Sequence, residues 1–84
     1  MPDQLFDRLV AVIAPLAPHP DAPLTPDADL VDDLGFDSLA LIELTVAIEE
    51  AFGLAPVAEF EQTTARTIGA VAAIVARAVA EQRP

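Results

Sequence analysis

The chain has 84 residues, a formal net charge of −10 and no cysteine. This length suffices for one modest hydrophobic core, and a hydrophobic content of 54% argues against disorder despite eight prolines. The lack of cysteine excludes disulfides, thiolate metal sites and cysteine catalysis. We therefore expect a single domain over residues 1–84.

The charges are distributed unevenly along the chain. No lysine is present and no arginine lies between Arg8 and Arg66. That window holds eleven acids: Asp21, Asp27, Asp29, Asp32, Asp33, Asp37, Glu43, Glu49, Glu50, Glu59 and Glu61. Nucleic-acid binding is excluded, because phosphate neutralisation needs lysine and arginine. The acids either attract basic patches on partner proteins or only keep a small apolar protein soluble.

No apolar run approaches the length of a membrane span, and an anionic membrane surface would repel this chain. The first residues include an acid rather than the basic region of a secretion signal. We expect a cytoplasmic protein that does not bind membranes.

The first predicted helix is capped by Asp3 and runs to about Ala14, where Pro15 ends or kinks it. Its apolar stripe comprises Leu5, Leu9, Val12, Ile13 and Leu16. A long connection rich in proline and aspartate follows, over residues 17–37. Its expected anchors on the core are Leu24, Leu30, Val31, Leu34 and Phe36.

The main predicted helix runs from Leu39 to Phe52, with Ser38 or Asp37 as its N-cap, because Gly35 breaks any earlier helix. At about 100° per residue, one side forms the core stripe. This side comprises Leu41, Leu44, Thr45, Ile48, Ala51 and Phe52. The opposite side mixes apolar and acidic residues, namely Leu39, Ile42, Glu43, Val46, Glu49 and Glu50.

This mixed side has the composition of a docking surface, with an apolar centre for burial and acids for steering. The alternative is that a short additional helix or the long connection covers Leu39, Ile42 and Val46.

Residues 58 to about 64 predict a short helix, and Thr67 caps a last helix from Ile68 to about Gln82. The inward-facing residues of this last helix are Ile68, Val71, Val75 and Val79. The sequence thus predicts an all-α bundle of three main helices plus a short one.

Ser38 lies at the start of the main helix, where the positive end of the helix dipole favours a phosphate. A hydrolase nucleophile would need G-x-S-x-G and a base, but the sequence around Ser38 lacks that motif. The only histidine, His19, lies between two prolines and is expected to be a solvated loop residue. No stretch of aspartates fits a calcium loop, so we predict neither a metal site nor catalytic residues.

Residues 30–53, LVDDLGFDSLALIELTVAIEEAFG, resemble the central part of an acyl carrier protein. The matching positions are Asp33, Leu34, Gly35, Asp37, Ser38, Leu39, Glu43, Leu44, Glu49, Glu50 and Phe52. The resemblance implies a four-helix carrier fold in which Ser38 is esterified by 4′-phosphopantetheine from coenzyme A. The thiol of that arm would carry acyl groups as thioesters.

The resemblance also implies a carrier that is not itself an enzyme, and we expect it to be a monomer. Its partners would be a phosphopantetheinyl transferase, an acyltransferase or acyl/aminoacyl ligase, and a ketosynthase or other assembly-line enzyme. Asp37 would either orient the transferase's metal–cofactor complex or only cap the helix. The mixed side of the main helix would be the surface that partner enzymes contact.

Two departures from family patterns bear on the pathway. Ala40 follows Leu39 where fatty-acid carriers typically have aspartate, and Phe36 stands where peptidyl carriers usually have glycine. We expect a discrete carrier for polyketide or related specialised metabolism. The alternatives are a fatty-acid carrier, an aminoacyl or peptidyl carrier of a nonribosomal pathway and, in a different class, a non-covalent acidic helical adaptor.

Overall fold

The computed structural model describes residues 2–19, 21–57 and 66–82. It contains α1 (Pro2–Ile13), a short 3-10 helix (Ala14–Leu16), α2 (Ser38–Phe52) and α4 (Ile68–Gln82). Strands are absent from the described residues, apart from an isolated antiparallel bridge between Asp29 and Thr67. The predicted all-α class is therefore confirmed, while the short helix predicted for residues 58–64 lies outside the described residues.

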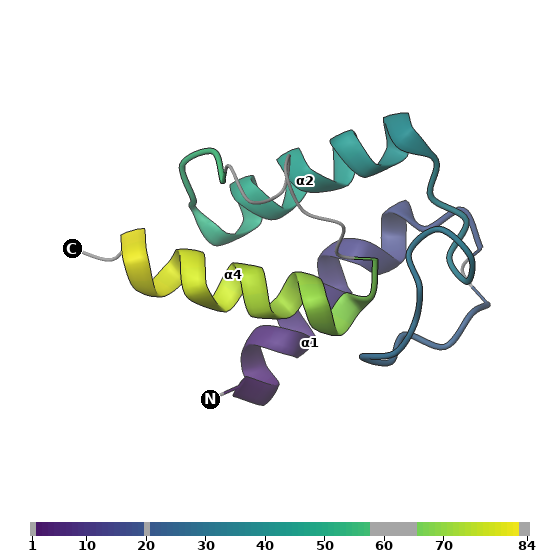
Figure 1. Cartoon of the computed structure of the whole chain (residues 1–84), viewed down its shortest axis with the longest axis horizontal. Helices are drawn as coiled ribbons and strands as arrows, with labels where there is room; N and C mark the ends of the chain where they lie inside the picture. Colours follow the sequence, from purple (N-terminus) through teal and green to yellow (C-terminus); the bar gives the residue numbers. More distant parts are fainter. Residues whose placement is uncertain (1, 20, 58–65, 83–84) are drawn as a thin grey trace.

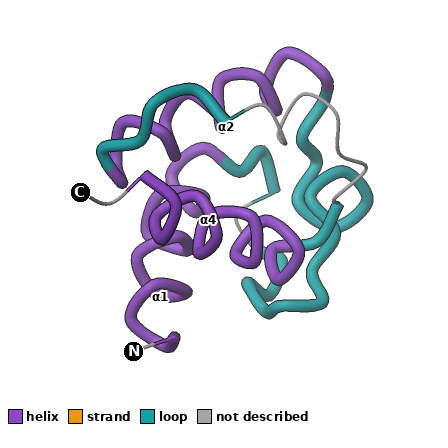
Figure 2. Tube along the Cα trace, turned by 60° about the vertical axis from the view of Figure 1, so that its left-hand side comes forward, coloured by secondary structure: helices purple, strands orange, loops and turns teal. Residues whose placement is uncertain are grey.

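The three α-helices are joined so that α1 packs against both α2 and α4. In Figure 1, α2 and α4 run in the same direction and α1 runs back the other way. The described parts of the long connection, residues 17–19 and 21–37, wrap the end of the molecule at which α2 and α4 begin (Figures 1 and 2). Of the helices described, none is long and apolar enough to cross a membrane.

The boundaries of α1 differ from the prediction at its start. The helix begins at Pro2, a residue whose fixed φ suits a first helical position. The prediction of Asp3 as the cap was therefore wrong, because Asp3 lies inside the first turn. At the other end, Pro15 falls in the 3-10 helix, and the chain becomes extended at Ala17.

The predicted apolar stripe of α1 is confirmed for four of its five members. Leu9 and Ile13 are fully buried, and Leu5 and Val12 pack against the same core. Leu16, however, is 43% exposed. A 3-10 helix turns more per residue than an α-helix, so the stripe does not continue through it.

The long connection is anchored to the core by Leu30, Leu34 and Phe36, which are buried as predicted, and by the partly buried Leu24. Val31 was predicted as a further anchor, but it is 38% exposed. It lies in the tight turn between the buried Leu30 and Leu34, so it faces outward.

The last helix confirms its predicted cap, because the Ala70 N–H donates to Thr67 Oγ1 over 3.1 Å. Ile68, Val71 and Val75 are buried and Val79 is partly buried. Ile74 and Ala78 are also buried, in a second small cluster with Val57 and Leu54 that the sequence did not predict.

Gly69 permits close contact between α4 and the long connection. Its N–H donates to the Pro26 carbonyl over 2.9 Å, and a Cβ at this position would lie 3.0 Å from the same oxygen. The helix-propensity disadvantage of glycine, about 1 kcal/mol, is thus offset by an approach that a side chain would disturb.

Candidate functional site

The approach segment, residues 29–37, leads into α2 and is shaped by aspartate side chains. Asp29 Oδ1 accepts hydrogen bonds from the backbone N–H groups of Val31 (2.8 Å) and Asp32 (2.7 Å). Asp33 Oδ2 in turn accepts from the Asp29 N–H over 2.7 Å. These bonds fix the turn that begins at Leu30. Some of the acids between Arg8 and Arg66 therefore have a structural role that their spacing in the sequence does not predict.

Arg66 ties this turn to the start of α4. Its Nε lies 3.4 Å from Asp29 Oδ2 and its Nη2 lies 3.4 Å from Asp32 Oδ1. Its carbonyl also accepts from the Leu30 N–H over 2.6 Å. The Asp32 N–H, the Val31 N–H and the Arg66 guanidinium together hold the pKa of Asp29 below its usual value. This contact spans 37 positions of sequence, so no local pattern predicts it.

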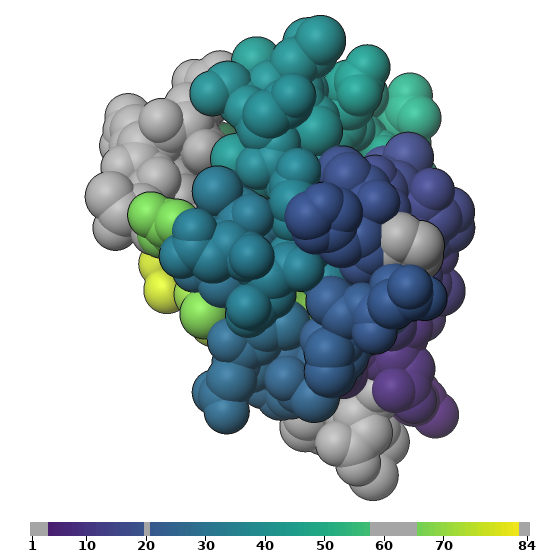
Figure 3. Space-filling view, turned by 90° about the vertical axis from the view of Figure 1, so that its right-hand side faces the viewer, coloured from purple at the N-terminus to yellow at the C-terminus, as the bar shows by residue number. Residues whose placement is uncertain are grey.

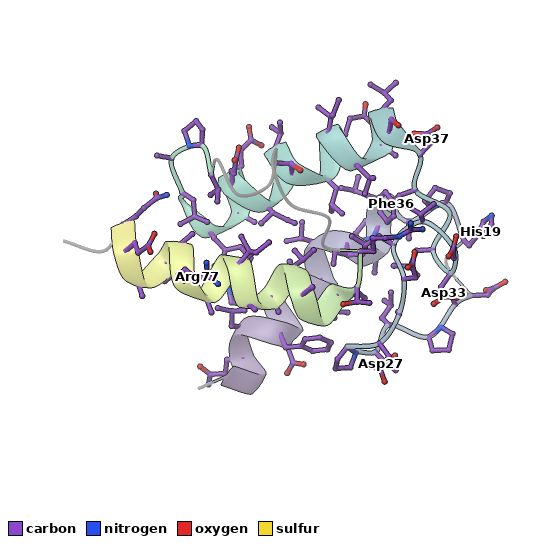
Figure 4. All side chains as sticks on the ribbon, viewed as in Figure 1. His19, Asp27, Asp33, Phe36, Asp37 and Arg77 are labelled. Atoms are coloured by element: carbon purple, nitrogen blue, oxygen red, sulfur yellow. The ribbon has the colours of Figure 1, made fainter. Side chains whose placement is uncertain are left out.

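Gly35 and Phe36 turn the chain toward α2. Gly35 has a φ of +83°, and a Cβ on it would lie 3.1 Å from three ring atoms of His19. The Phe36 side chain is 1% exposed, and its N–H donates to the Leu30 carbonyl over 2.9 Å. Figure 4 shows Phe36 turned toward the helices and Asp37 at the outer side of the start of α2.

Asp37 is the N-cap of α2, which decides between the two predicted capping residues. Its backbone is extended, and its Oδ1 accepts from the Ala40 N–H over 2.8 Å. Ser38 is the first residue of α2 and is exposed. Its hydroxyl is therefore not needed to cap the helix.

The surroundings of Ser38 suit a covalently attached phosphate. The first turn of α2 contains no acid, and its N-terminus supplies the positive end of the helix dipole. In Figure 3, the long connection occupies the middle of the face and the start of α2 lies at the top, reachable from solvent. The exposed position of Ser38 leaves room for a long prosthetic group.

The two predicted sides of α2 are distinct in the structure. Leu44 and Ile48 are buried, and Leu41, Thr45 and Phe52 are partly buried, whereas Ala51 is exposed, contrary to the prediction. On the other side, Leu39 is 67% exposed, Ile42 62% and Val46 48%. The long connection therefore does not cover these three side chains.

The three glutamates of this side do not share one environment. Glu43 and Glu50 are exposed, as expected for a docking surface. Glu49 is half-buried, and its Oε2 accepts from the Val57 N–H over 2.9 Å. Sequence periodicity places all three glutamates together and does not reveal this difference.

His19 is exposed, as expected, although its ring also lies against Gly35. In the part of the chain that the structure describes, no group of three or more histidine, aspartate or glutamate side chains is arranged to hold a metal ion.

Comparison with known proteins identifies the family. The model of the family described as "Phosphopantetheine attachment site" matches residues 7–75. The chain belongs to this family. The phosphopantetheine group predicted from the resemblance is the one for which the family is described.

Proteins similar to this chain include several that are named "Acyl carrier protein". One from Helicobacter pylori (strain G27) is 48% identical over 50 residues, which cover 60% of this chain and 64% of the relative. One from Thermobifida fusca (strain YX) is 39% identical over 51 residues, covering 61% of this chain and 65% of the relative. The chain thus spans slightly less than two thirds of these relatives. The predicted resemblance to acyl carrier proteins is confirmed.

Proposed function

We propose that the chain is an acyl carrier whose attachment point is Ser38. The observation that carries this proposal is an exposed serine hydroxyl at the positive end of α2, inside the region that matches the phosphopantetheine-attachment family. Once attached, the phosphopantetheine arm supplies a thiol that holds acyl groups as thioesters. The chain itself is a carrier and not an enzyme.

The residues around Ser38 present it to a separate phosphopantetheinyl transferase. Asp37 fixes the first turn of α2, and the buried Phe36 fixes where that turn begins. The helix dipole then stabilises the negative phosphodiester. We propose that Asp37 acts mainly through this cap. An additional role in orienting the transferase's metal–cofactor complex is tested by Asp37→Asn, which retains a capping oxygen and removes the charge.

The proposal is tested by intact-mass measurement after incubation with coenzyme A and a promiscuous phosphopantetheinyl transferase. The wild type and Thr25→Ala, which removes another exposed hydroxyl, should each gain one phosphopantetheine. Ser38→Ala should gain none. A wild type that stays unmodified would support the alternative of a non-covalent acidic adaptor.

We propose further that partner enzymes dock on the outer face of α2. Support comes from three exposed apolar side chains beside exposed carboxylates, which is an unusual surface for a small protein unless it meets a partner. This outer face comprises Leu39, Ile42, Glu43, Val46 and Glu50, whereas the half-buried Glu49, whose Oε2 accepts from the Val57 N–H, lies beside it. The partners would be the transferase, an acyltransferase or acyl/aminoacyl ligase, and a ketosynthase or similar assembly-line enzyme.

Charge reversal tests this docking face. Glu43→Lys with Glu50→Lys should slow modification by about tenfold at low salt, because steering by a basic partner is lost. Its effect on folding should stay within about 0.5 kcal/mol per substitution. Leu39→Ala and Val46→Ala should instead hasten dissociation. If the variant with both substitutions is modified at the wild-type rate at low salt, the outer face is not the docking site.

For the cargo, we propose acyl chains of polyketide or related specialised metabolism. Support comes from Ala40, which leaves the first turn of α2 without the aspartate typical of fatty-acid carriers. The fatty-acid alternative is favoured by the sequence identity to the named acyl carrier proteins. Loading assays with a malonyl transferase of fatty-acid synthesis and one of polyketide synthesis separate the two, since the preferred partner should load faster.

A further inference from the structure

The exit segment, residues 53–57, follows α2, and two long polar side chains form hydrogen bonds with its backbone. Glu49 Oε2 accepts a hydrogen bond from the Val57 N–H over 2.9 Å. Gln82, in α4, accepts from the Ala55 N–H over 2.7 Å and donates from Nε2 to the Ala55 carbonyl over 3.3 Å. The exit segment is thus held from α2 on one side and from α4 on the other.

The bond to Val57 matters because this residue is buried. Val57 is 7% exposed and packs with Ile74 and Ala78 of α4 and with the partly buried Leu54. A partly buried backbone N–H that loses its acceptor destabilises the folded state more than an exposed one does, because water replaces the bond less readily. Glu49 therefore supplies an acceptor at the point where the exit segment enters an apolar environment.

The other two glutamates of α2 are placed differently. Glu43 and Glu50 are exposed, whereas Glu49 is half-buried with one carboxylate oxygen committed to the exit segment. A carboxylate attracts a partner most strongly when the partner's basic side chains can approach its oxygens closely, which exposure allows. An acceptor for a backbone N–H needs only an oxygen in the right place, which a neutral amide also supplies.

We infer that Glu49 is a positioning residue for the exit segment and does not steer partners. It acts as a hydrogen-bond acceptor that keeps Val57 against α4, and the negative charge of its carboxylate is dispensable. This inference rests on the proposed carrier function only in what it says about partners. Of the three glutamates on this side of α2, only Glu43 and Glu50 then attract partners to the outer face.

The test compares Glu49→Gln with Glu49→Ala, and uses Glu43→Gln and Glu43→Ala as the matched pair at an exposed position. Amide exchange at Val57 and the melting temperature are measured on the unmodified protein. The rate of modification by a phosphopantetheinyl transferase is measured at low and high salt.

Glu49→Gln should keep slow exchange at Val57 and wild-type modification rates at both salt concentrations. Glu49→Ala should speed exchange at Val57 by about tenfold, the factor expected when one hydrogen bond of typical strength is lost, and lower the melting temperature. Both Glu43 variants should leave Val57 unchanged and slow modification at low salt only.

The inference is overturned if Glu49→Gln slows modification at low salt as much as Glu43→Gln does, or if Glu49→Ala leaves exchange at Val57 unchanged. A wild type that cannot be modified at all contradicts the carrier function instead. The exchange and melting measurements still decide the role of Glu49 in that event, because neither depends on Ser38.

Discussion

The two segments that flank α2 are both fixed by bonds from side chains to the backbone, but these bonds differ in reach. In the approach segment, Asp29 and Asp33 bond to groups two to four residues away. In the exit segment, Glu49 bonds to a group eight residues away and Gln82 to groups 27 residues away. The turn of the approach segment is thus formed by local bonds and then joined to the start of α4 by Arg66, whereas the side-chain bonds of the exit segment reach farther along the chain.

The two segments also enter different parts of the core. Phe36 of the approach segment joins the main cluster, with residues from α1, α2 and α4, whereas Val57 of the exit segment joins a small separate cluster. The segment that positions Ser38 should therefore be the more stable of the two. Four measurements test this difference.

The largest effect is expected from Phe36→Ala. Emptying a fully buried aromatic site should lower the free energy of unfolding by about 3–5 kcal/mol. Val57→Ala removes two methyl groups from the smaller cluster and should cost roughly 1.6 kcal/mol. Urea denaturation of both variants checks the order, and a Val57→Ala cost as large as that of Phe36→Ala, despite the smaller deletion, would show that the exit segment is the more tightly packed of the two.

The next effect separates two glycines that both have positive φ, Gly35 at +83° and Gly53 at +66°. Alanine in this region costs about 1–2 kcal/mol. At Gly53 a Cβ meets no atom within 4 Å, but at Gly35 it meets the His19 ring at 3.1 Å. Gly35→Ala should therefore destabilise more than Gly53→Ala.

Removing the ring with His19→Ala should bring the cost of Gly35→Ala close to that of Gly53→Ala. Thermal unfolding of the two single glycine variants, of His19→Ala and of the double variant measures this coupling. Additive effects would mean that the ring moves aside without cost.

A smaller effect is expected at the cap of α2. Asp37→Ala should lower the free energy of unfolding by about 1 kcal/mol, because the Ala40 N–H loses its acceptor. Asp37→Asn should stay near the wild type, since asparagine caps equally well. Chemical denaturation compares the two. An asparagine variant as unstable as the alanine variant would show that the charge matters more than the hydrogen bond.

The smallest effect concerns pH. Because folding lowers the pKa of Asp29, this carboxylate stabilises the folded protein above the ordinary aspartate pKa of about 3.9, and the contribution is lost as pH falls through the lowered pKa. The stability difference between the wild type and Asp29→Ala should shrink on acidification. The difference caused by Gln82→Ala at the exit segment should not, since that amide does not titrate. Melting curves over the acidic range test both, and a constant difference for Asp29→Ala would contradict the account.

The sequence separation of the interacting groups also explains which features can be predicted from the sequence. The start of α2, its exposed apolar side chains and the anchors Leu34 and Phe36 follow from local patterns, and the structure has them. The prediction for Val31 rests on its apolar side chain and that for Leu16 on helical periodicity, but neither sets the orientation of a residue in a turn or a 3-10 helix.

Contacts between distant parts of the chain cannot be predicted from local sequence patterns. Arg66 reaches Asp29 and Asp32, and Gln82 reaches Ala55, only after the helices have packed. Helical periodicity likewise places Glu49 on the same side of α2 as Glu43 and Glu50. Periodicity shows which side of a helix a residue occupies, but the backbone donor that Glu49 meets belongs to another segment.

We propose that the hydroxyl presented by the approach segment is the one that receives phosphopantetheine. The chain contains one serine and five threonines, so the modified residue can be assigned without ambiguity. The direct measurement is fragmentation mass spectrometry of the protein after treatment with coenzyme A and a phosphopantetheinyl transferase. We predict that the added group lies on Ser38 and on no threonine. A group on any threonine, or undiminished modification of Ser38→Ala, would contradict it.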